Sequence, residues 1–386
     1  MRRKFLGIFA AAALLITLLP SFSVKADEKP SVSALAAVLI SADTGEIVYS
    51  ENSETKLPMA STTKIMSALI CLESGSLYDE FTVDSDAIKV EGSSMGLQEG
   101  DVVTKYALCC GMLLPSGNDA ANAAAVEIAG SIDAFADMMN ERAQEIGMSQ
   151  TYFVTPSGLE GEGHGSSAED MALLAREALR NPLFAEICSS QNIKVSFGNP
   201  PYERWLTNTN KLLSMYDGVY GVKTGFTDEA GRCLVSACER DGKRLICVTL
   251  NDKNDWNDHI ALYEYGFTKV TCEKISLPEF IEVDIVGSQA ENIKLISVSS
   301  AADVTMLSKD KSAFSYKIIS PPFVYAPVGE GEQLASLVLT YKDKEICEIP
   351  LFAESSYDAV NSSDNASSKK ENLLDKTINF FRRIFS

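Results

Sequence analysis

The chain has 386 residues, 46% of them hydrophobic, and a formal net charge of −19 at pH 7. That length suffices for one large domain and a smaller one. The acidity excludes attraction to nucleic acid through the overall field, because nucleic-acid-binding proteins neutralise phosphates with Lys and Arg. The two histidines, His164 and His259, lie far apart, and neither has ligand-like spacing around it. We therefore expect no metal site and no cofactor.

The N-terminus has the pattern of a secretory signal. A basic head at residues 2–4 precedes an apolar run over residues 5–19, and Val24 and Ala26 are the small residues that a signal peptidase inspects. A membrane-spanning anchor is the alternative, but a run of about 15 residues is short for crossing a bilayer. We expect residues 1–26 to be removed on export. Their loss takes away four basic residues and no acid, which leaves a net charge of −23.

Nine cysteines in an exported chain raise the question of disulfides. Their number is odd, and no Cys-x-x-Cys occurs. Cys71, Cys109, Cys110 and Cys247 lie inside apolar runs. The pattern favours small buried hydrophobic side chains, with disulfide bonding as the alternative.

The first part of the mature chain is predicted to begin with a β-hairpin and to continue mainly as helices. Apolar runs at residues 36–40 and 46–49 flank Asp43-Thr44-Gly45, which is typical of a hairpin. Helices are then predicted from Ser61 through the apolar positions up to Ile70, over 102–114, over 119–130, over 133–146, and from the capping residues Ser166 and Ser167 to about Arg180.

After Asn181-Pro182 strands dominate the prediction. The elements are a strand ending near Gly225, strands at 233–238 and 244–250 joined by a turn at 240–243, and a closing helix over 256–265. Residues 275–352 then consist of short β-rich runs separated by polar turns. This composition predicts a separate small all-β domain without catalytic candidates.

The C-terminal residues change character twice. Residues 353–368 are rich in Ser, Asn and Asp, which is typical of a flexible linker. In residues 369–386, Leu373, Ile378 and Phe381 lie on one helical stripe. The same segment contains five Lys/Arg and only two acidic residues. An apolar stripe with cations predicts a helix lying in a membrane surface. The alternative is a helix that packs back on the protein.

Two polar residues begin the first predicted helix. Ser61 and Lys64 are three residues apart, so they share one helix face. An amine beside a hydroxyl can take its proton when the hydroxyl attacks a carbonyl, and burial lowers the pKa of such a lysine. Alone, the pair also fits a capping serine with a solvated lysine.

Two further segments complete a pattern. Ser116-Gly117-Asn118 lies on a tight turn between two apolar helices, and Lys223-Thr224-Gly225, which occurs once, ends a predicted strand. Together with Ser61-x-x-Lys64, in this order, they are typical of serine β-lactamases and penicillin-binding proteins.

The longer sequence segments around these three motifs are more specific than the motifs alone. Residues 58–66 (PMASTTKIM), 113–121 (LLPSGNDAA) and 221–227 (GVKTGFT) resemble the low-molecular-mass penicillin-binding proteins, the D-alanyl-D-alanine carboxypeptidases. The resemblance covers residues 31 to about 350 and the amphipathic tail. It implies an α/β (α+β) fold: a β-lactamase/transpeptidase-like catalytic domain, a small C-terminal all-β domain and an amphipathic C-terminal helix.

This resemblance gives names to the predicted parts of the chain. They are a signal peptide (1–26), a catalytic domain (31–272), a β-rich domain (273–352), a linker (353–368) and a membrane-surface helix (369–386).

The resemblance also implies catalytic roles. Ser61 would be the nucleophile that attacks the peptide bond between two terminal D-alanines, and Lys64 would be its general base. Ser116 would relay a proton to the leaving D-alanine, and Lys223 would tune it electrostatically.

Substrate binding is implied for the same segments. Asn118 would hydrogen-bond the substrate's backbone amide, and the strand from Lys223 through Gly225 to Phe226 would pair with the substrate. Thr224 would touch its terminal carboxylate. The backbone N–H groups of Ser61 and Phe226 would form the oxyanion hole.

One position departs from the resemblance. Some relatives place an arginine shortly before the closing helix to hold the terminal carboxylate, but residues 254–259 contain none. Lys253 and Arg232 are the candidates to replace it.

Three functions compete. The first is a D,D-carboxypeptidase at the outer face of the cytoplasmic membrane or in the cell wall, with peptidoglycan stem peptides as substrates and β-lactams as inhibitors. The second is a penicillin-hydrolysing enzyme, which needs a carboxylate poised on a water; Glu160, Glu162 and Glu169 lie in the right region without a recognisable pattern. The third is a wall-binding protein with an inactive site, against which the intact motifs argue.

Overall fold

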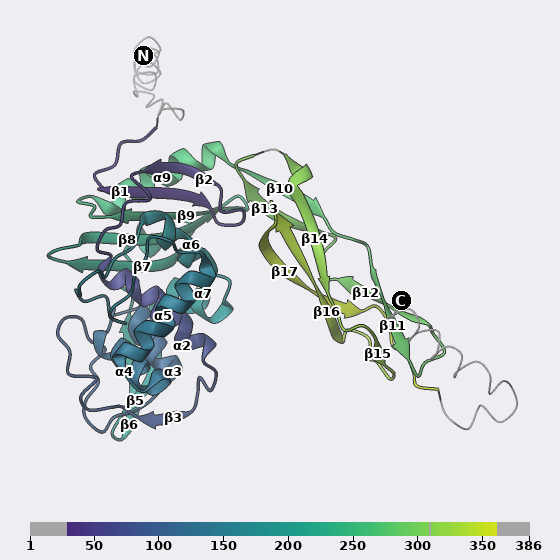
Figure 1. Cartoon of the computed structure of the whole chain (residues 1–386), viewed down its shortest axis with the longest axis horizontal. Coiled ribbons are helices and arrows are strands. Elements are labelled where there is room, and N and C mark those ends of the chain that lie inside the picture. Colours follow the sequence, from purple (N-terminus) through teal and green to yellow (C-terminus); the bar gives the residue numbers. More distant parts are fainter. Residues whose placement is uncertain (1–28, 309, 361–386) are drawn as a thin grey trace, which may run out of the picture.

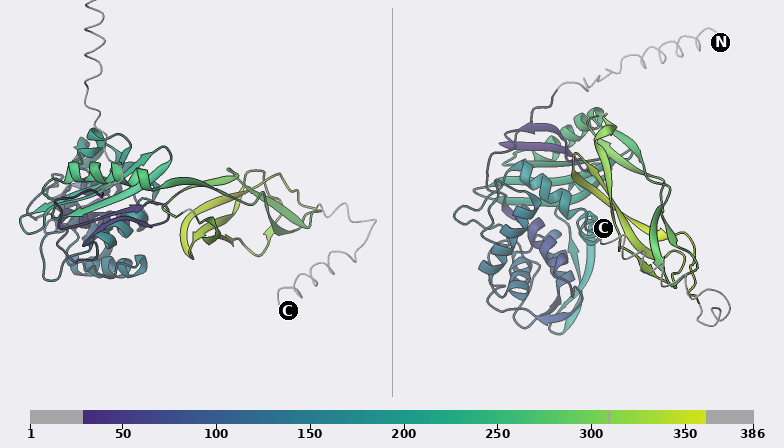
Figure 2. Two further views of the ribbon diagram at one scale, coloured as in Figure 1. Left: turned by 90° about the horizontal axis from the view of Figure 1, so that it is seen from above. Right: turned by 45° about the vertical axis from the view of Figure 1, so that its right-hand side comes forward.

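The computed structural model describes residues 29–308 and 310–360. The predicted signal peptide and the predicted amphipathic helix lie outside these residues. The described chain forms a larger body of helices and sheets and a smaller body built mainly of strands, which extends away from it (Figure 1). The view from above shows the β-rich body extending to one side of the larger body (Figure 2, left).

A five-stranded antiparallel sheet organises the larger body, in the order β2-β1-β9-β8-β7. Its strands are β1 (Ala36–Ser41), β2 (Ile47–Glu51), β7 (Val219–Thr227), β8 (Gly231–Arg240) and β9 (Lys243–Leu250). The predicted hairpin at the N-terminus and the three predicted strands between 219 and 250 are therefore confirmed. Because β7 is an edge strand, one side of its backbone is available to pair with another chain.

Helices pack on both faces of this sheet and on one another. The described helices of the larger body are α2 (Lys64–Glu73), α3 (Lys105–Leu113), α4 (Asn118–Ala129), α5 (Ile132–Ile146), α6 (Ala168–Ala178), α7 (Pro182–Ser189), α8 (Leu212–Met215) and α9 (Asp255–Lys269). Every residue of α2 from Lys64 to Leu72 is buried, so α2 lies at the centre of the main core. On the other face, α9 packs Leu262 and Tyr263 against the sheet.

Several helix boundaries coincide with capping residues, of which Ser167 was predicted. Ser131 and Ser167 cap α5 and α6 by accepting a backbone N–H in the first turn, and left-handed Gly130 and Gly147 end α4 and α5. The helix predicted over 102–114 is partly wrong. Its first three residues form strand β4 (Val102–Thr104), which pairs with β3 (Glu80–Thr82), and the helix begins only at Lys105.

Several elements were not predicted, and two strands and one helix among them stand out. Strands β5 (Asn192–Gly198) and β6 (Pro201–Thr207) form a hairpin that completes a sheet of order β3-β4-β5-β6. Helix α7 begins at Pro182, and the Asn181 side chain caps it by accepting the N–H groups of Leu183 and Phe184. Proline at the first helical position after a capping asparagine was an available signal.

The smaller body has a core of its own. Its strands are β10 (Thr271–Ser276), β11 (Ile281–Val286), β12 (Asn292–Ser297), β13 (Ala301–Met306), β14 (Phe314–Ile319), β15 (Val324–Tyr325), β16 (Gln333–Tyr341) and β17 (Lys344–Ala353). Strands β10 and β13 form a separate pair, and the other six form a sheet of order β14-β16-β17-β12-β11-β15.

The beginning of the predicted linker is bound to this β-rich body. Tyr357 forms a two-way backbone bridge with Val328, and its hydroxyl accepts the N–H of Lys294 at 3.1 Å. The N–H of Val360 donates to the carbonyl of Gly287 at 2.8 Å. Residues 361–368 lie outside the described residues.

Acidic residues of the β1–β2 hairpin connect the two bodies. Asp43 accepts the N–H of Thr305 at 2.6 Å and pairs with Arg244 at 2.7 Å. Glu46 accepts the N–H of Leu307 and the hydroxyl of Tyr341, both at 2.9 Å. We call these contacts the hairpin clamp.

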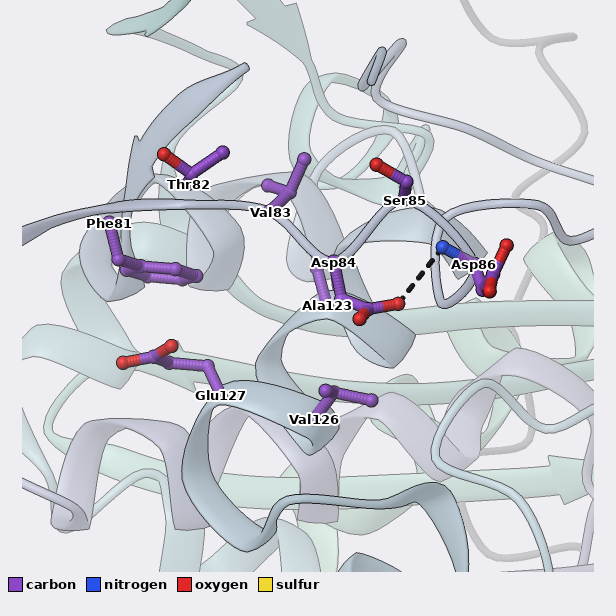
Figure 3. Close-up of a pocket in the computed structure, with 9 residues that line it drawn as sticks. All are labelled: Phe81, Thr82, Val83, Asp84, Ser85, Asp86, Ala123, Val126 and Glu127. Atoms are coloured by element: carbon purple, nitrogen blue, oxygen red, sulfur yellow. Dashed lines mark hydrogen bonds between the residues drawn. The ribbon is translucent and has the colours of Figure 1, made fainter. Parts of the chain in front are cut away.

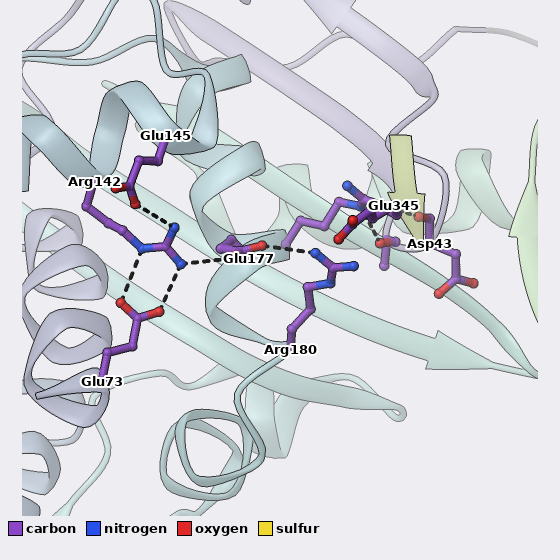
Figure 4. A network of polar contacts seen from close by, with 9 residues as sticks. Asp43, Glu73, Arg142, Glu145, Glu177, Arg180 and Glu345 are labelled. Carbon is purple, nitrogen blue, oxygen red and sulfur yellow. Dashed lines mark hydrogen bonds and ion pairs between the residues drawn. The ribbon is translucent and has the colours of Figure 1, made fainter. Parts of the chain in front are cut away.

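A polar network lies beside the clamp. Arg142 on α5 pairs with Glu73 at 2.9 Å and with Glu177 at 2.8 Å, so one guanidinium joins α2, α5 and α6 (Figure 4). The residue before Glu177 in α6, Arg176, donates to the carbonyl of Asp43 and, at 3.1 Å, to that of Glu345 in the β-rich body.

All nine cysteines are within the described residues, and all are free thiols. Seven are buried and two are half-buried, which supports their interpretation as small hydrophobic side chains. Among the described residues, no helix combines the length and the apolarity required to cross a membrane.

Candidate active site

Ser61 and Lys64 lie where a short 3-10 turn, η2 (Ala60–Thr63), continues into α2. The Nζ atom of Lys64 is 2.9 Å from the Oγ atom of Ser61. Ser61 is half-buried, whereas Lys64 is completely buried. The hydroxyl can therefore be reached from solvent while its neighbouring amine is shielded.

The amine of Lys64 has two further partners, the side-chain oxygen of Asn118 and the backbone carbonyl of Ser157, both at 2.6 Å. Burial lowers the pKa of Lys64 well below its ordinary value, and the charge of Lys223 lowers it further. Near neutral pH, the neutral form of this amine is therefore populated far more than in a solvated lysine.

Ser116 and Asn118 lie on the turn between α3 and α4. Ser116 is buried and has a left-handed backbone, with φ of +67°. Asn118 begins α4, and its amide donates to the carbonyl of Glu91 at 2.6 Å. This bond leaves its oxygen for Lys64, so the turn brings the second motif to the first.

Asp119, one residue further on, was not predicted. Its carboxylate accepts the backbone N–H groups of Met95, Gly96 and Leu97 at 2.9–3.0 Å and the hydroxyl of Ser94 at 2.5 Å. An acid in the first turn of a helix is the signal that could have identified it. Asp119 fastens the loop over residues 93–97 against the start of α4.

Strand β7 reaches the same place through Gly225. A Cβ atom there would lie 3.0 Å from the carbonyl of Met59 and 3.1 Å from the backbone nitrogen of Ser61. Only glycine allows this approach without displacement. Phe226 is 63% exposed, and Thr224 shares a 2.8 Å hydrogen bond with Thr209. The strand thus passes directly beside the serine.

Lys223 lies on the same strand, and its buried amine donates to the carbonyl of Thr224 at 2.9 Å. Burial lowers its pKa to about 7. Gly225, two residues further along the same strand, lies against the backbone of Met59 and Ser61. The three predicted motifs therefore converge.

A loop over residues 154–165 closes the site on another side. Gly158 has φ of +84°, and a Cβ atom there would lie 2.0 Å from the carbonyl of Ala60. His164 accepts the N–H of Val154 on Nδ1 at 3.0 Å, so in the neutral ring the hydrogen is on Nε2, which donates to Thr63 at 3.0 Å. From the sequence, His164 had no predicted role in this loop.

Two other places in the described residues contain polar groups or a cavity but no predicted site residue. His259 lies between Ser236 at 2.7 Å and Thr249 at 3.0 Å, but all three are fully buried and no substrate can reach them. A cavity of about 420 Å³ lies between β3 and α4 (Figure 3). Asp84 and Glu127 line it, and it contains none of the predicted site residues.

The fold and this arrangement define a serine acyl-transfer enzyme of the class that includes penicillin-binding proteins and β-lactamases. The sequence model of the D-alanyl-D-alanine carboxypeptidase family, peptidase family S11, matches residues 23–254. The chain belongs to this family. It is 30% identical over 367 residues to D-alanyl-D-alanine carboxypeptidase DacF of Bacillus subtilis, covering 91% of this chain and 94% of DacF.

Solved structures of similar proteins support the same family assignment. Penicillin-binding protein 5 from Haemophilus influenzae has a TM-score of 0.61 and 26% identity, covering 86% of this chain and 99% of that one. The D-alanyl-D-alanine carboxypeptidase from Mycobacterium tuberculosis H37Rv has a TM-score of 0.60 and 31% identity, covering 64% and 95%. The mixed α/β catalytic fold followed by a β-rich domain is therefore confirmed.

Proposed function

We propose that this chain is a serine-type D-Ala-D-Ala carboxypeptidase that removes the terminal D-alanine from peptidoglycan stem pentapeptides. The observation that carries the proposal is the 2.9 Å contact between a buried, pKa-lowered Lys64 and an accessible Ser61, beside an edge strand that can pair with an extended peptide. The names of its family and relatives support the same activity.

The steps follow from the residues. Ser61 Oγ attacks the carbonyl carbon of the penultimate D-alanine, and Lys64 takes the hydroxyl proton. The peptide bond breaks, Ser116 relays a proton to the leaving nitrogen under the influence of Lys223, and free D-alanine departs. Water then cleaves the acyl ester and regenerates Ser61.

Binding uses the remaining predicted residues. The substrate adds to the free edge of β7 along Thr224, Gly225 and Phe226, and Asn118 bonds its backbone amide. The N–H groups of Ser61 and Phe226 stabilise the oxyanion. The close approach of Gly225 to the backbone nitrogen of Ser61 supports this pairing of donors.

Penicillin hydrolysis has less support. The carboxylates considered for a deacylating water do not contact Lys64, whose described partners are Ser61, Asn118 and Ser157. Glu169 instead accepts a hydrogen bond from Ser53 at 3.3 Å.

Mass spectrometry of a defined stem pentapeptide tests the proposal. The wild type should release one D-alanine, and Ser61→Ala should release none. A fluorescent penicillin should label the wild type stably and should not label Ser61→Ala. Rapid turnover of the penicillin would support the hydrolase, and a wild type without label or product would support an inactive wall-binding protein.

Export and membrane attachment belong to the same proposal. Residues 1–26 would direct secretion, and residues 369–386 would hold the enzyme at the outer face of the cytoplasmic membrane. Deletion of 369–386 should release the mature protein from vesicles containing anionic lipid. Retention on the vesicles would contradict the anchor.

A further inference from the structure

Arg232 lies beside the strand that is proposed to pair with substrate. In the β7–β8 ladder, Arg232 is directly opposite Phe226, and Thr224 is the diagonal neighbour on the same face. Diagonal neighbours on one face of a sheet lie within reach of a long side chain. Strand register therefore directs a guanidinium toward the part of β7 where the substrate's C-terminus is proposed to lie.

The guanidinium is held by two residues at the start of α9. A single nitrogen, Nη2, donates to both carboxylate oxygens of Asp255 at 2.7 and 2.8 Å. Asp255 is 3% exposed, and the Cζ atom of Arg232 lies 5.3 Å from the ring centroid of Trp256. Nε and Nη1 take no part in this ion pair. Arg232 is thus a positioned, partly exposed cation with donors to spare.

The substrate supplies the need for such a cation. A stem peptide cut at its last residue carries a free α-carboxylate on the leaving D-alanine. Lys64 is committed to Ser61, and burial lowers the pKa of Lys223 to about 7, so the positive charge of each is reduced near neutral pH. Arginine keeps its charge throughout this range and binds carboxylates through a planar fork.

Neighbouring cations are less suited. Residues 254–259 contain no Lys or Arg, and Lys253 is exposed on the loop before α9. A flexible, hydrated ammonium without a fixed partner selects a carboxylate less sharply than a preorganised guanidinium.

We propose that Arg232, positioned by Asp255 and Trp256, binds the terminal α-carboxylate of the stem peptide and so selects a free C-terminus over an amidated one. The inference rests on the proposed carboxypeptidase function and names its specificity residue. The guanidinium of Arg232 would then have two carboxylate partners, Asp255 through Nη2 and the substrate through its remaining donors.

The test compares two peptides that differ only in ending in D-Ala-D-Ala acid or D-Ala-D-Ala amide. The wild type should have the larger kcat/KM for the acid. Arg232→Gln should lower that value on the order of 10- to 100-fold, as expected for losing hydrogen bonds to a charged group, and leave the amide within about twofold. Arg232→Lys should recover part of the preference. Lys253→Gln, the matched control, should preserve it fully.

Asp255→Asn separates positioning from folding. It should raise KM for the acid more than it lowers kcat and should leave the amide unchanged. Equal losses on both peptides in Arg232→Gln and Asp255→Asn would overturn the inference, as would full loss of the preference in Lys253→Gln. If the wild type releases no D-alanine from either peptide, the proposed function itself fails, which is a different result.

Discussion

The amine of Lys64 is buried among three oxygen acceptors, and none of them is a carboxylate. These acceptors orient the amine without giving it a full countercharge. Desolvation and the nearby charge of Lys223 therefore decide its protonation, and both lower its pKa. A general base with this environment works at neutral pH, where an ordinary lysine is almost fully protonated.

The pH dependence of acylation should report this coupling. A neutral Lys64 is required, so the rate should fall as pH drops through its pKa. Lys223→Gln removes a positive neighbour, which raises the pKa of Lys64 and should move the acid limb upward on the order of one pH unit. The measurement is the rate of fluorescent-penicillin labelling between pH 5 and 9. Lys211→Gln, at an exposed lysine, is the control, and an acid limb that stays in place in Lys223→Gln would contradict the coupling.

His164 should make the fold sensitive to acid. Burial lowers its pKa from 6.5 to about 4. Between these values the unfolded chain binds more protons than the folded one, so the stability is complete above pH 6.5 and falls toward pH 4. The loss is at most about 1.4 kcal/mol per pH unit. Thermal melts of His164→Gln should depend less on pH between 7 and 5 than melts of the wild type.

The remaining histidine provides the comparison for that experiment. Burial lowers the pKa of His259 to about 3, so it contributes a slope of the same sign in both proteins. A slope for His164→Gln as steep as that of the wild type would show that His164 does not titrate in this range.

At the scale of elements, the loop over 154–165 packs against the turn η2 at Gly158. Gly158→Ala would place a methyl group 2.0 Å from the carbonyl of Ala60, next to the nucleophile. We expect penicillin labelling to slow at least about tenfold, because small displacements of reacting groups are costly. Gly163→Ala has a similar positive φ of +83° but no contact closer than 3.7 Å, so it controls for backbone strain. Equal effects of the two changes would rule out the clash.

The sequence predicted those elements whose signals are local. The hairpin at β1–β2, helix α5 and strands β8 and β9 follow from turn residues and apolar periodicity. At 102–104 an apolar run was extended into a helix, because pairing with β3 is a tertiary contact that no local pattern records. Strand β5 was missed although Ile193, Val195 and Phe197 alternate before a turn, which is a recognisable strand signal.

The candidate site likewise contains groups that the sequence predicts and groups that it does not. Ser61, Lys64, Ser116 and Lys223 were predicted because side-chain chemistry leaves a motif. The carbonyl of Ser157, which binds Lys64, could not be predicted, because every residue has a carbonyl and only the folded loop selects this one.

At the scale of the whole molecule, the hairpin clamp joins the catalytic sheet to the β-rich body. Burial alone would raise the pKa of Glu46, but hydrogen bonds from Leu307 and Tyr341 lower it overall. This contribution to stability is therefore present at neutral pH and is lost as pH falls through the folded-state pKa. Beside it, Asp43 holds Thr305 and Arg244.

Glu46→Gln should loosen the joint between the bodies. The loss of charge-assisted hydrogen bonds should cost on the order of 1–2 kcal/mol and lower the melting temperature. Limited proteolysis should then cut more readily near residues 298–308, while penicillin labelling of the folded enzyme persists. Glu54→Gln, at an exposed glutamate in the loop after β2, is the control. Unchanged proteolysis of Glu46→Gln would show that the clamp is not held by this carboxylate.

The close approach of Gly225 to Ser61 has a practical consequence. Ser61 and the proposed second oxyanion donor, Phe226, lie more than 160 positions apart in the sequence, and nothing local holds them together in a denatured chain. A covalent antibiotic would therefore mark only molecules that have completed this long-range closure. Timed addition of labelled penicillin during refolding would therefore measure how fast the contact between Gly225 and Ser61 forms, independently of any spectroscopic signal.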